Sequence, residues 1–257
     1  YADYNAGTEK PLIAQVTNTG ILDTSFNADD TPGLNIFTIP GGGTVQKIMG
    51  SVILPEGKIA AVGQELLTGL YTPFQVSMFD TQFSDEVNRA PDFVPQGGFD
   101  TSFDTDGKDA VYANGATDAT ANQEIKAVRQ LSNLKLMTVT STGAQSWSLR
   151  VDQDGANDVS YGSGNGILID QYNGSETVEQ MQLDGAGNMM VVGTHSTNGG
   201  YLKRVLANGT MSPLFGGISG DPVGTLYNIM SEAYGVAQLT TGNMIIIGNN
   251  SGVGTAT

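Results

Sequence analysis

The chain has 257 residues, of which 39% are hydrophobic and only 14% charged, and its 26 acidic and 11 basic side chains give a formal net charge of −15. Such a chain has no cluster of Lys and Arg to neutralise phosphates, so nucleic acid and anionic membranes are excluded as expected partners. Cysteine is absent, which rules out disulfides and thiolate metal sites. No apolar run reaches the roughly 18 residues of a membrane span.

Residues 1–11 are polar and form an expected N-terminal extension without the pattern of a signal peptide. From residue 12 onward, three short sequence elements recur in a fixed order. The first is a stretch in which apolar and polar residues alternate, as they do in half-buried strands. Its four copies are residues 12–16, 74–78, 147–151 and 201–205.

The second element is a turn glycine followed, six residues later, by an aromatic residue. Three of the four copies also carry an aspartate, at Asp23, Asp100 and Asp158, and the fourth has Ser212 in its place. Glycine suits the tight turn because it adopts backbone angles that other residues avoid. The four pairs are Gly20 and Phe26, Gly97 and Phe103, Gly155 and Tyr161, and Gly209 and Phe215.

The third element is a pair of apolar runs joined by a short turn, which predicts a β-hairpin. The upstream runs end at Leu54, Leu131, Leu183 and Leu239, and the downstream runs follow Lys58, Lys135, Asn188 and Asn243. Residues 124–136 could also pass as a helix. Their place in the repeat predicts strands instead.

These elements define four copies of a repeat with a period of roughly 55 to 60 residues. The expected repeats lie at about 12–71, 72–146, 147–200 and 201–257, within one domain of residues 12–257. The second repeat is longer because of an insertion at about residues 81–96, which predicts a surface loop, a common location for a binding face.

The combination of strand, turn glycine, L-D-x-S-F and a hairpin with G-K-I-x-x-x-G resembles the delta-60 repeat family over residues 12–257. The first repeat fits best, with Asp23, Phe26 and Gly63 in place, while Arg150 and Arg204 match the family's strand arginine in the third and fourth. The second repeat lacks that arginine and ends its hairpin at Thr140. The resemblance implies β-propeller blades in a bacterial protein, often exported or on the surface. It implies no shared catalytic residue or cofactor.

We therefore expect an all-β fold, a β-propeller of about four blades with about four antiparallel strands each. The chain begins with the strand at 12–16 and ends after the hairpin of the fourth repeat. The last blade lacks that strand unless the N-terminal one supplies it, so we expect the strand at 12–16 to join the last blade and close the ring, which removes an exposed edge. The alternative is an open array in which that strand pairs with another chain and makes a polymer.

Candidate sites are few. Two acidic loops have the alternating aspartates of a calcium loop, although Asp-Gly is also what a plain turn requires. Their residues are Asp104, Asp106 and Asp109, and Asp152, Asp154 and Asp158. His195 stands alone and is expected on the surface. No catalytic residue and no cofactor is predicted.

Three sequons offer glycosylation sites at Asn173, Asn249 and Asn208, the last of which also reads as a turn with Gly209. Four aromatic residues could stack on sugars, although core packing fits Trp147 better. They are Tyr71, Tyr112, Tyr172 and Trp147.

The sequence thus favours a non-catalytic, extracellular or cell-surface β-propeller that acts as a structural subunit of a surface assembly or filament, or in adhesion. Its expected partners are proteins, including further copies of itself. The alternative is a lectin-like propeller that binds carbohydrate through loops on one face. An enzyme is the weakest alternative, because no titratable residues converge in the sequence pattern.

Overall fold

The computed structural model describes residues 10–24, 32–36, 45–54, 58–67, 70–79, 102–104, 108–110, 123–141, 146–170, 176–216 and 222–250. Within these ranges the chain forms sixteen β-strands and no helix, which confirms the expected all-β class. Accordingly, the described part of the chain contains no helix that could cross a membrane.

Three sheets have four antiparallel strands each, and the strands of each sheet follow one another in chain order. Sheet 1 consists of β3 (Gln46–Ile53), β4 (Lys58–Leu67), β5 (Leu70–Phe79) and β6 (Lys108–Ala110). Sheet 2 consists of β7 (Glu124–Gln130), β8 (Leu136–Ser141), β9 (Ser146–Val151) and β10 (Ile167–Asp170). Sheet 3 consists of β11 (Glu176–Leu183), β12 (Met189–His195), β13 (Gly199–Val205) and β14 (Thr225–Leu226).

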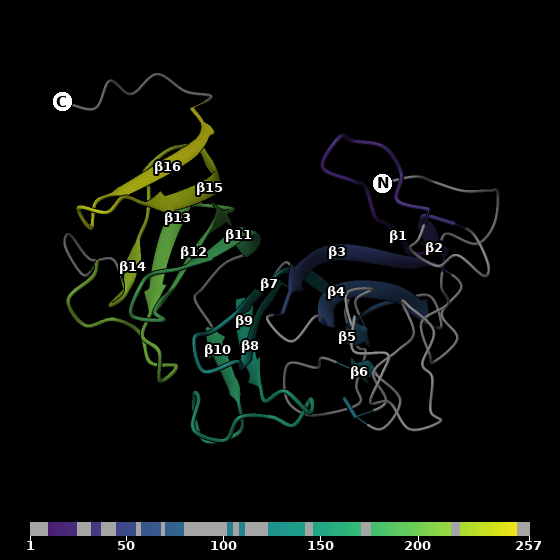
Figure 1. Ribbon diagram of the computed structural model, residues 1–257. Helices are drawn as coiled ribbons and strands as arrows, with labels where there is room; N and C mark the ends of the chain where they lie inside the picture. Colours follow the sequence, from purple (N-terminus) through teal and green to yellow (C-terminus); the bar gives the residue numbers. More distant parts are fainter. Residues whose placement is uncertain are drawn as a thin grey trace.

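Two smaller sheets lie at the ends of the series. The N-terminal half-sheet pairs β1 (Leu12–Ala14) with β2 (Leu34–Ile36), and the C-terminal half-sheet pairs β15 (Glu232–Gln238) with β16 (Met244–Asn249). The sheets succeed one another along an arc, with β1 and β2 at one end and β15 and β16 at the other (Figure 1). This succession of antiparallel sheets is propeller-like.

The repeat is visible in the backbone hydrogen bonds of the turns that follow three of the four first-element strands, those that the structure describes. In sheet 2, the N–H of Gly155 donates to the carbonyl of Asp152 at 3.1 Å, and the N–H of Asp158 donates to the carbonyl of Arg150 at 2.9 Å. The same two bonds recur in the copies that contain Gly20 and Gly209. All three glycines have a φ near +80°, where a side chain would be strained.

The hairpins also share a structural detail. Each has a β-bulge in its first strand, at Met49, Lys126, Glu179 and Tyr234, so that one residue has no direct partner across the pair. Beside the bulge stands Gly63, Thr140, Gly193 or Gly248. Residues 124–136, which could have passed as a helix, form the hairpin of β7 and β8, as the repeat predicted.

The hydrogen bonds of the hairpin turns correct one position in the alignment of the four repeats. Leu54, Leu131 and Leu239 each donate an N–H across their hairpin turn, and the equivalent donor in sheet 3 is Asp184 rather than Leu183. Leu183 is the last residue of β11 and pairs with Met189. The apolar run in that repeat therefore ends one residue earlier than in the other three.

The hydrophobic core is divided into layers between successive sheets. Between sheets 1 and 2 lie side chains such as Val62, Phe103 and Trp147, and between sheets 2 and 3 lie side chains such as Met181 and Tyr201. A third layer joins sheet 3 to β15 and β16, and a small fourth layer joins Ile13 of β1 to Phe74 and Val76 of sheet 1. Each sheet thus buries both faces only because it has a neighbour on either side.

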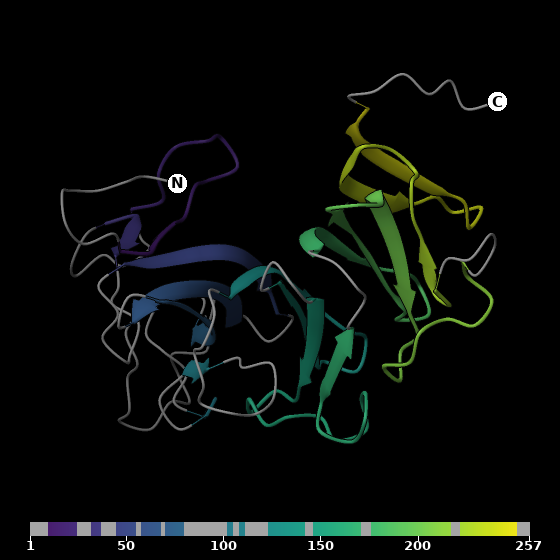
Figure 2. The same cartoon turned by 180° about the vertical axis from the view of Figure 1, so that it is seen from behind.

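Closure of the ring is not observed. Among the described residues β1 pairs with β2 and β16 pairs with β15, while β1 and β16 do not pair with each other. The two half-sheets lie at opposite ends of the arc in both views (Figures 1 and 2). Residues 81–96, the predicted insertion, lie outside the described residues, and the single-domain and repeat boundaries stay predictions.

Candidate functional site

Among the described residues, the motif turn of sheet 2 forms a polar site centred on Asp158. One carboxylate oxygen of Asp158 accepts a bond from Arg150 Nε at 2.5 Å and lies 2.8 Å from Lys135 Nζ. The other accepts from the backbone N–H and the hydroxyl of Ser160 at 3.0 Å and 2.7 Å. β8 begins directly after Lys135 and β9 carries Arg150, so two neighbouring strands deliver the cations to one buried carboxylate.

This environment fixes the charge of the site. Burial alone would raise the pKa of Asp158, but the hydrogen bonds from Lys135, Ser160 and Arg150 outweigh it and hold that pKa well below its ordinary value. The hydrogen bonds with Asp158 and Asp152 in turn raise the pKa of Lys135. Asp158 is therefore ionised at neutral pH, and its role is to neutralise two cations.

Arg150 also connects sheet 2 to sheet 3. Its Nη1 donates to the carbonyl of Ala207, in the turn that follows β13, and its guanidinium lies 4.7 Å from the centre of the Tyr161 ring. The Tyr161 hydroxyl shares a hydrogen bond of 2.6 Å with Ser148, and burial raises the pKa of Tyr161 to about 12. The motif residues thus hold one sheet against the turn of the next.

The same junction occurs between sheets 1 and 2. The residue after Phe103 and the residue after Tyr161 each donate an N–H to the turn of the next sheet, from Asp104 to Asp154 at 2.9 Å and from Gly162 to Asn208 at 3.0 Å. The aromatics themselves pack on the next turn glycine. A Cβ placed on Gly155 would lie 3.4 Å from the ring of Phe103, and one on Gly209 would lie 2.9 Å from the ring of Tyr161.

These contacts give the repeat residues a common role. An aromatic of one repeat covers the turn glycine of the next, and a side chain there would be tightly crowded at Gly155 and would clash at Gly209. We call this contact the aromatic–glycine junction; it pairs Phe103 with Gly155 and Tyr161 with Gly209. Of the other predicted repeat residues, Gly20, Asp23 and Phe215 are described, while Phe26, Gly97 and Asp100 lie outside the described residues.

The fourth repeat shows how the motif tolerates the loss of its aspartate. Ser212 stands where Asp158 stands in sheet 2, and Arg204 instead contacts Asp184 at 2.8 Å. Burial would raise the pKa of Asp184, but hydrogen bonds from Asn188, Arg204 and the N–H of Ala186 lower it. In sheet 3 the carboxylate that binds the strand arginine therefore comes from Asp184, in the turn between β11 and β12, and not from the motif turn.

A second polar cluster is buried between sheets 2 and 3. Glu176 and Lys203 are only 1% and 3% exposed and form an ion pair of 2.5 Å. Glu176 also accepts hydrogen bonds from Ser146 at 2.9 Å and from the hydroxyl of Tyr227 at 2.8 Å. A buried ion pair is tolerated when further hydrogen bonds satisfy the carboxylate in this way.

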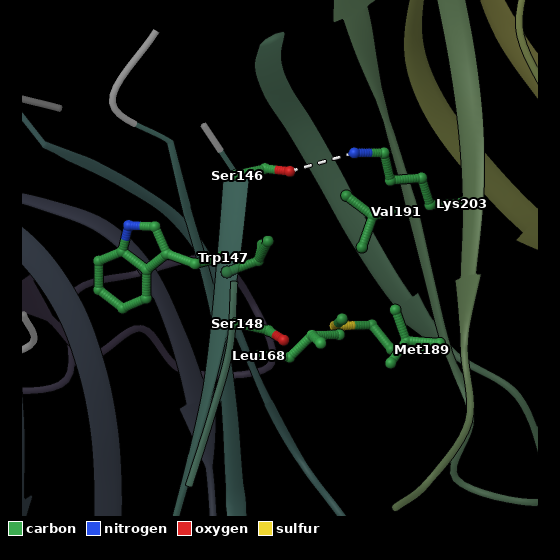
Figure 3. A pocket seen from close by; sticks show the side chains of 9 residues that line it. Ser146, Trp147, Ser148, Leu168, Met189, Val191 and Lys203 are labelled. Carbon is green, nitrogen blue, oxygen red and sulfur yellow. Dashed lines mark hydrogen bonds between the residues drawn. The ribbon is translucent and has the colours of Figure 1, made fainter. Parts of the chain in front are cut away.

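The space beside this cluster is small. A cavity of about 20 Å³ lies between β9 and β12 and is lined by Ser146, Ser148, Leu168, Val191 and Lys203 among others (Figure 3). That volume holds about one water molecule. The arrangement therefore has the character of an inter-sheet contact and offers no room for a substrate.

The calcium candidates meet different outcomes. Lys135 Nζ lies 2.9 Å from Asp152 as well as beside Asp158. The ammonium group of Lys135 therefore already pairs with these two carboxylates. Asp154 accepts a bond from the N–H of Ala156 at 3.1 Å, as in a plain turn. Asp106 and the side chain of Asp109 lie outside the described residues. Within the described ranges, no three acidic or histidine side chains form a group that could hold a metal ion.

His195 was expected on the surface, and this expectation is wrong. It ends β12 and is 1% exposed, with its Nδ1 accepting from the backbone N–H groups of Thr197 and Asn198 at 3.1 Å and 3.0 Å. Its ring lies edge-on to Tyr227 at 5.2 Å. The histidine caps the turn between β12 and β13, a role that a sequence pattern does not reveal.

The remaining candidates are the aromatic residues that could stack on sugars and the three glycosylation sequons. Trp147 is 2% exposed, so it packs in the core as expected and cannot stack on a sugar. Asn208 accepts bonds from Thr210 within its own turn, while Asn249 is exposed at the end of β16. The aromatics at 71, 112 and 172 and the sequon at 173 lie where the structure describes no side chain.

A second glycine recurs in the repeats and was not predicted from the sequence. Gly33, Gly166 and Gly224 each accept a backbone bond from the first-element strand, from Gln15, Arg150 and Arg204, at 2.8 to 3.2 Å. All three have a φ near +80° and directly precede the last strand of their sheet. Their distance from the motif aromatic differs in each repeat, so a search at fixed spacing misses them.

No family model and no curated protein matches the chain, so membership of the delta-60 family stays a prediction. One solved structure with a similar chain trace is the crystal structure of a protein of unknown function from Bacteroides caccae. It shares 10% sequence identity at a TM-score of 0.45, over 91% of this chain. The chain spans 62% of that protein's length.

Proposed function

We propose that the protein is a non-catalytic structural subunit of the delta-60 type that acts by binding other protein chains, in a cell-surface assembly or in adhesion. The observation that carries this proposal is the pair of half-sheets, in which no described strand pairs with the outer edge of β1 or of β16; we call these edges the open ends. The strand β16 has the sequence MIIIGN, and Ile245 and Ile247 are 47% and 66% exposed. An exposed, apolar edge strand is a template for pairing with another chain.

Comparison with the other sheets supports the same function. The equivalent strands β8 and β12 are almost entirely buried, because β9 or β13 pairs with their outer edge and neighbouring sheets pack on both of their faces. β16 is the corresponding strand of the C-terminal half-sheet, and no strand in the described ranges pairs with its outer edge. The low charge content and the many Gly, Thr, Asn and Asp residues are typical of exported surface proteins, which is where the proposal places the protein.

The test is the mass of the full chain in solution. Light scattering over a range of concentrations is expected to show species heavier than a single chain. The variant Ile247→Lys is expected to shift the mass toward one chain, because a charge on the apolar edge prevents burial. Ile53→Lys is the matched control, since Ile53 is 71% exposed and lies on β3 rather than at an open end. A single-chain mass for the unmodified protein at every concentration would contradict the proposal.

A further inference from the structure

The two open ends of the chain are complementary, and we infer that β1 of a second copy pairs with β16 to complete a four-stranded sheet between two subunits. This inference rests on the function proposed above and specifies the partner and its register. Four features of the two half-sheets carry it: backbone edges, register, exposed faces and the aromatic–glycine junction.

The backbone edges match. In β1, the N–H and carbonyl of Gln15 are bonded to Gly33 and Asp23, on the side of β2. Because successive residues of a strand direct these groups to opposite sides, Ala14 and Val16 direct theirs to the open side. In β16, Asn243 is bonded to Leu239 on the side of β15, so Met244 and Ile246 direct theirs outward.

The register follows from the complete sheets. Val151 pairs with Leu136 in sheet 2, and Val205 pairs with Met189 in sheet 3. The equivalent residues at the two open ends are Val16 and Met244. The predicted register is therefore Met244 with Val16, Ile246 with Ala14, and Gly248 with Leu12. Each of these pairs joins two residues whose backbone groups point to the open sides.

The exposed faces match as well. On β16, Met244 and Ile246 pack against sheet 3, which leaves Ile245 and Ile247 exposed on the other face. On β1, Ile13 packs against sheet 1, while Leu12 and Val16 are exposed. In the joined sheet, Leu12 and Val16 continue the face that packs on sheet 3 of one subunit. Ile245 and Ile247 continue the face that packs on sheet 1 of the other.

The two residues of a further aromatic–glycine junction lie at opposite ends of the arc, Phe215 near the C-terminal half-sheet and Gly20 near the N-terminal half-sheet. Phe215 is equivalent to Phe103 and Tyr161 but remains only partly buried. Gly20 is equivalent to Gly155 and Gly209, and a Cβ placed on it would meet nothing within 4 Å. In the joined pair, Phe215 of one copy covers Gly20 of the next, as the internal junctions do.

The chain's own β1 is held away from β16. Ile13 fixes the N-terminal half-sheet to sheet 1, and Ala233 and Val236 fix the C-terminal half-sheet to sheet 3. In both views these half-sheets lie at opposite ends of the arc (Figures 1 and 2). A second copy brings the same β1 to β16 without changing either attachment. Each added copy presents a new β16 edge, so the contact is head-to-tail and continues into a filament or a ring of several subunits.

Cysteine cross-linking of the full chain tests the register and the partner together, because the chain has no cysteine of its own. The register places Gln15 opposite Ile245, so Gln15→Cys and Ile245→Cys are made as two single variants with tags of different size. After mixing and oxidation, we expect a non-reducing gel to show a shift to the mixed dimer. Ala14→Cys mixed with Ile245→Cys is the control, because one residue of slip places the side chains on opposite faces.

The outcomes separate the two proposals. A mixed dimer from the Gln15 variant and none from the Ala14 control supports the inference. If a chain carrying both Gln15→Cys and Ile245→Cys cross-links within itself and the mixture gives no dimer, the ring closes in one chain and the inference is overturned. If the unmodified chain associates by light scattering but neither mixture cross-links, this register is wrong while the proposed function stands. A chain that shows one-chain mass throughout overturns both.

Discussion

Asp158 neutralises two cations in a buried site, so its charge matters more than its volume. We expect Asp158→Asn to lower the free energy of unfolding by about 3 kcal/mol, because Arg150 and Lys135 lose their common partner. The control is Asp154→Asn, which lies on the exposed side of the same turn and keeps an oxygen for the N–H of Ala156. Its expected effect is within about 0.5 kcal/mol. Denaturant unfolding measures both.

The buried carboxylates of Asp158 and Asp184 make the stability of the fold sensitive to acid. The pKa values of Asp158 and Asp184 are lower in the folded chain than their ordinary value of 3.8. A lowered folded pKa stabilises the fold above the unfolded pKa, and this contribution is lost as the pH falls below that value. We expect the thermal midpoint to drop as the pH is lowered from about 5 to 2, and Asp158→Asn to make that drop shallower. An unchanged slope in the variant would show that Asp158 does not carry the effect.

At the residue scale, the sequence identified both Arg150 and Asp158 but did not predict that they form an ion pair. Arg150 and Asp158 belong to one motif, so the repeat pattern pointed to both. The partner of Glu176 is Lys203, which lies on another strand of the same sheet, and Ser146 reaches the pair from sheet 2. A contact of that kind depends on how sheets pack, which no local pattern encodes.

The hairpin is the element that each repeat builds in the same way, and three of its four copies have a glycine beside the bulge, where the facing backbone carbonyl comes close. A Cβ on Gly193 would lie 1.8 Å from the carbonyl oxygen of Thr177. We expect Gly193→Ala to destabilise the fold by about 2 to 4 kcal/mol, because backbone must move to make room. Gly185→Ala is the control, since a Cβ there meets nothing within 4 Å. Equal thermal midpoints for the two variants would contradict this account.

At the element scale, the strands were predictable and their irregularities were not. Apolar alternation and turn glycines located the hairpins, and the position of residues 124–136 in the repeat correctly outweighed their helix-like pattern. The bulges at Met49, Lys126, Glu179 and Tyr234 add a residue whose type differs each time, so no residue pattern signals them. Leu183 was misaligned for a related reason, since a run of apolar residues does not mark where its strand ends.

At the scale of the whole molecule, the number of repeats predicts how many sheets form but not how they curve. Closure depends on the small rotation between neighbouring sheets, which the packing of side chains in each layer determines. The phase of the repeat indicated that the last blade lacks a strand unless the strand at 12–16 supplies it, and the expected closure by that strand is not observed among the described residues. The phase left open which chain completes that blade, and the separation of the two half-sheets in the structure favours a second copy.

The net charge of −15 predicts how that association depends on salt. Two copies repel each other at long range, while the proposed joined sheet would be held by backbone bonds and apolar contacts that salt does not screen. The Debye length falls from about 30 Å at 0.01 M salt to about 8 Å at 0.15 M, so added salt removes repulsion and leaves the attraction. We therefore expect sedimentation to show tighter association as NaCl rises over this range, and KCl to act equally because screening does not distinguish the two cations. Weaker association with salt would indicate that ion pairs hold the subunits together, which the apolar edge of β16 does not predict.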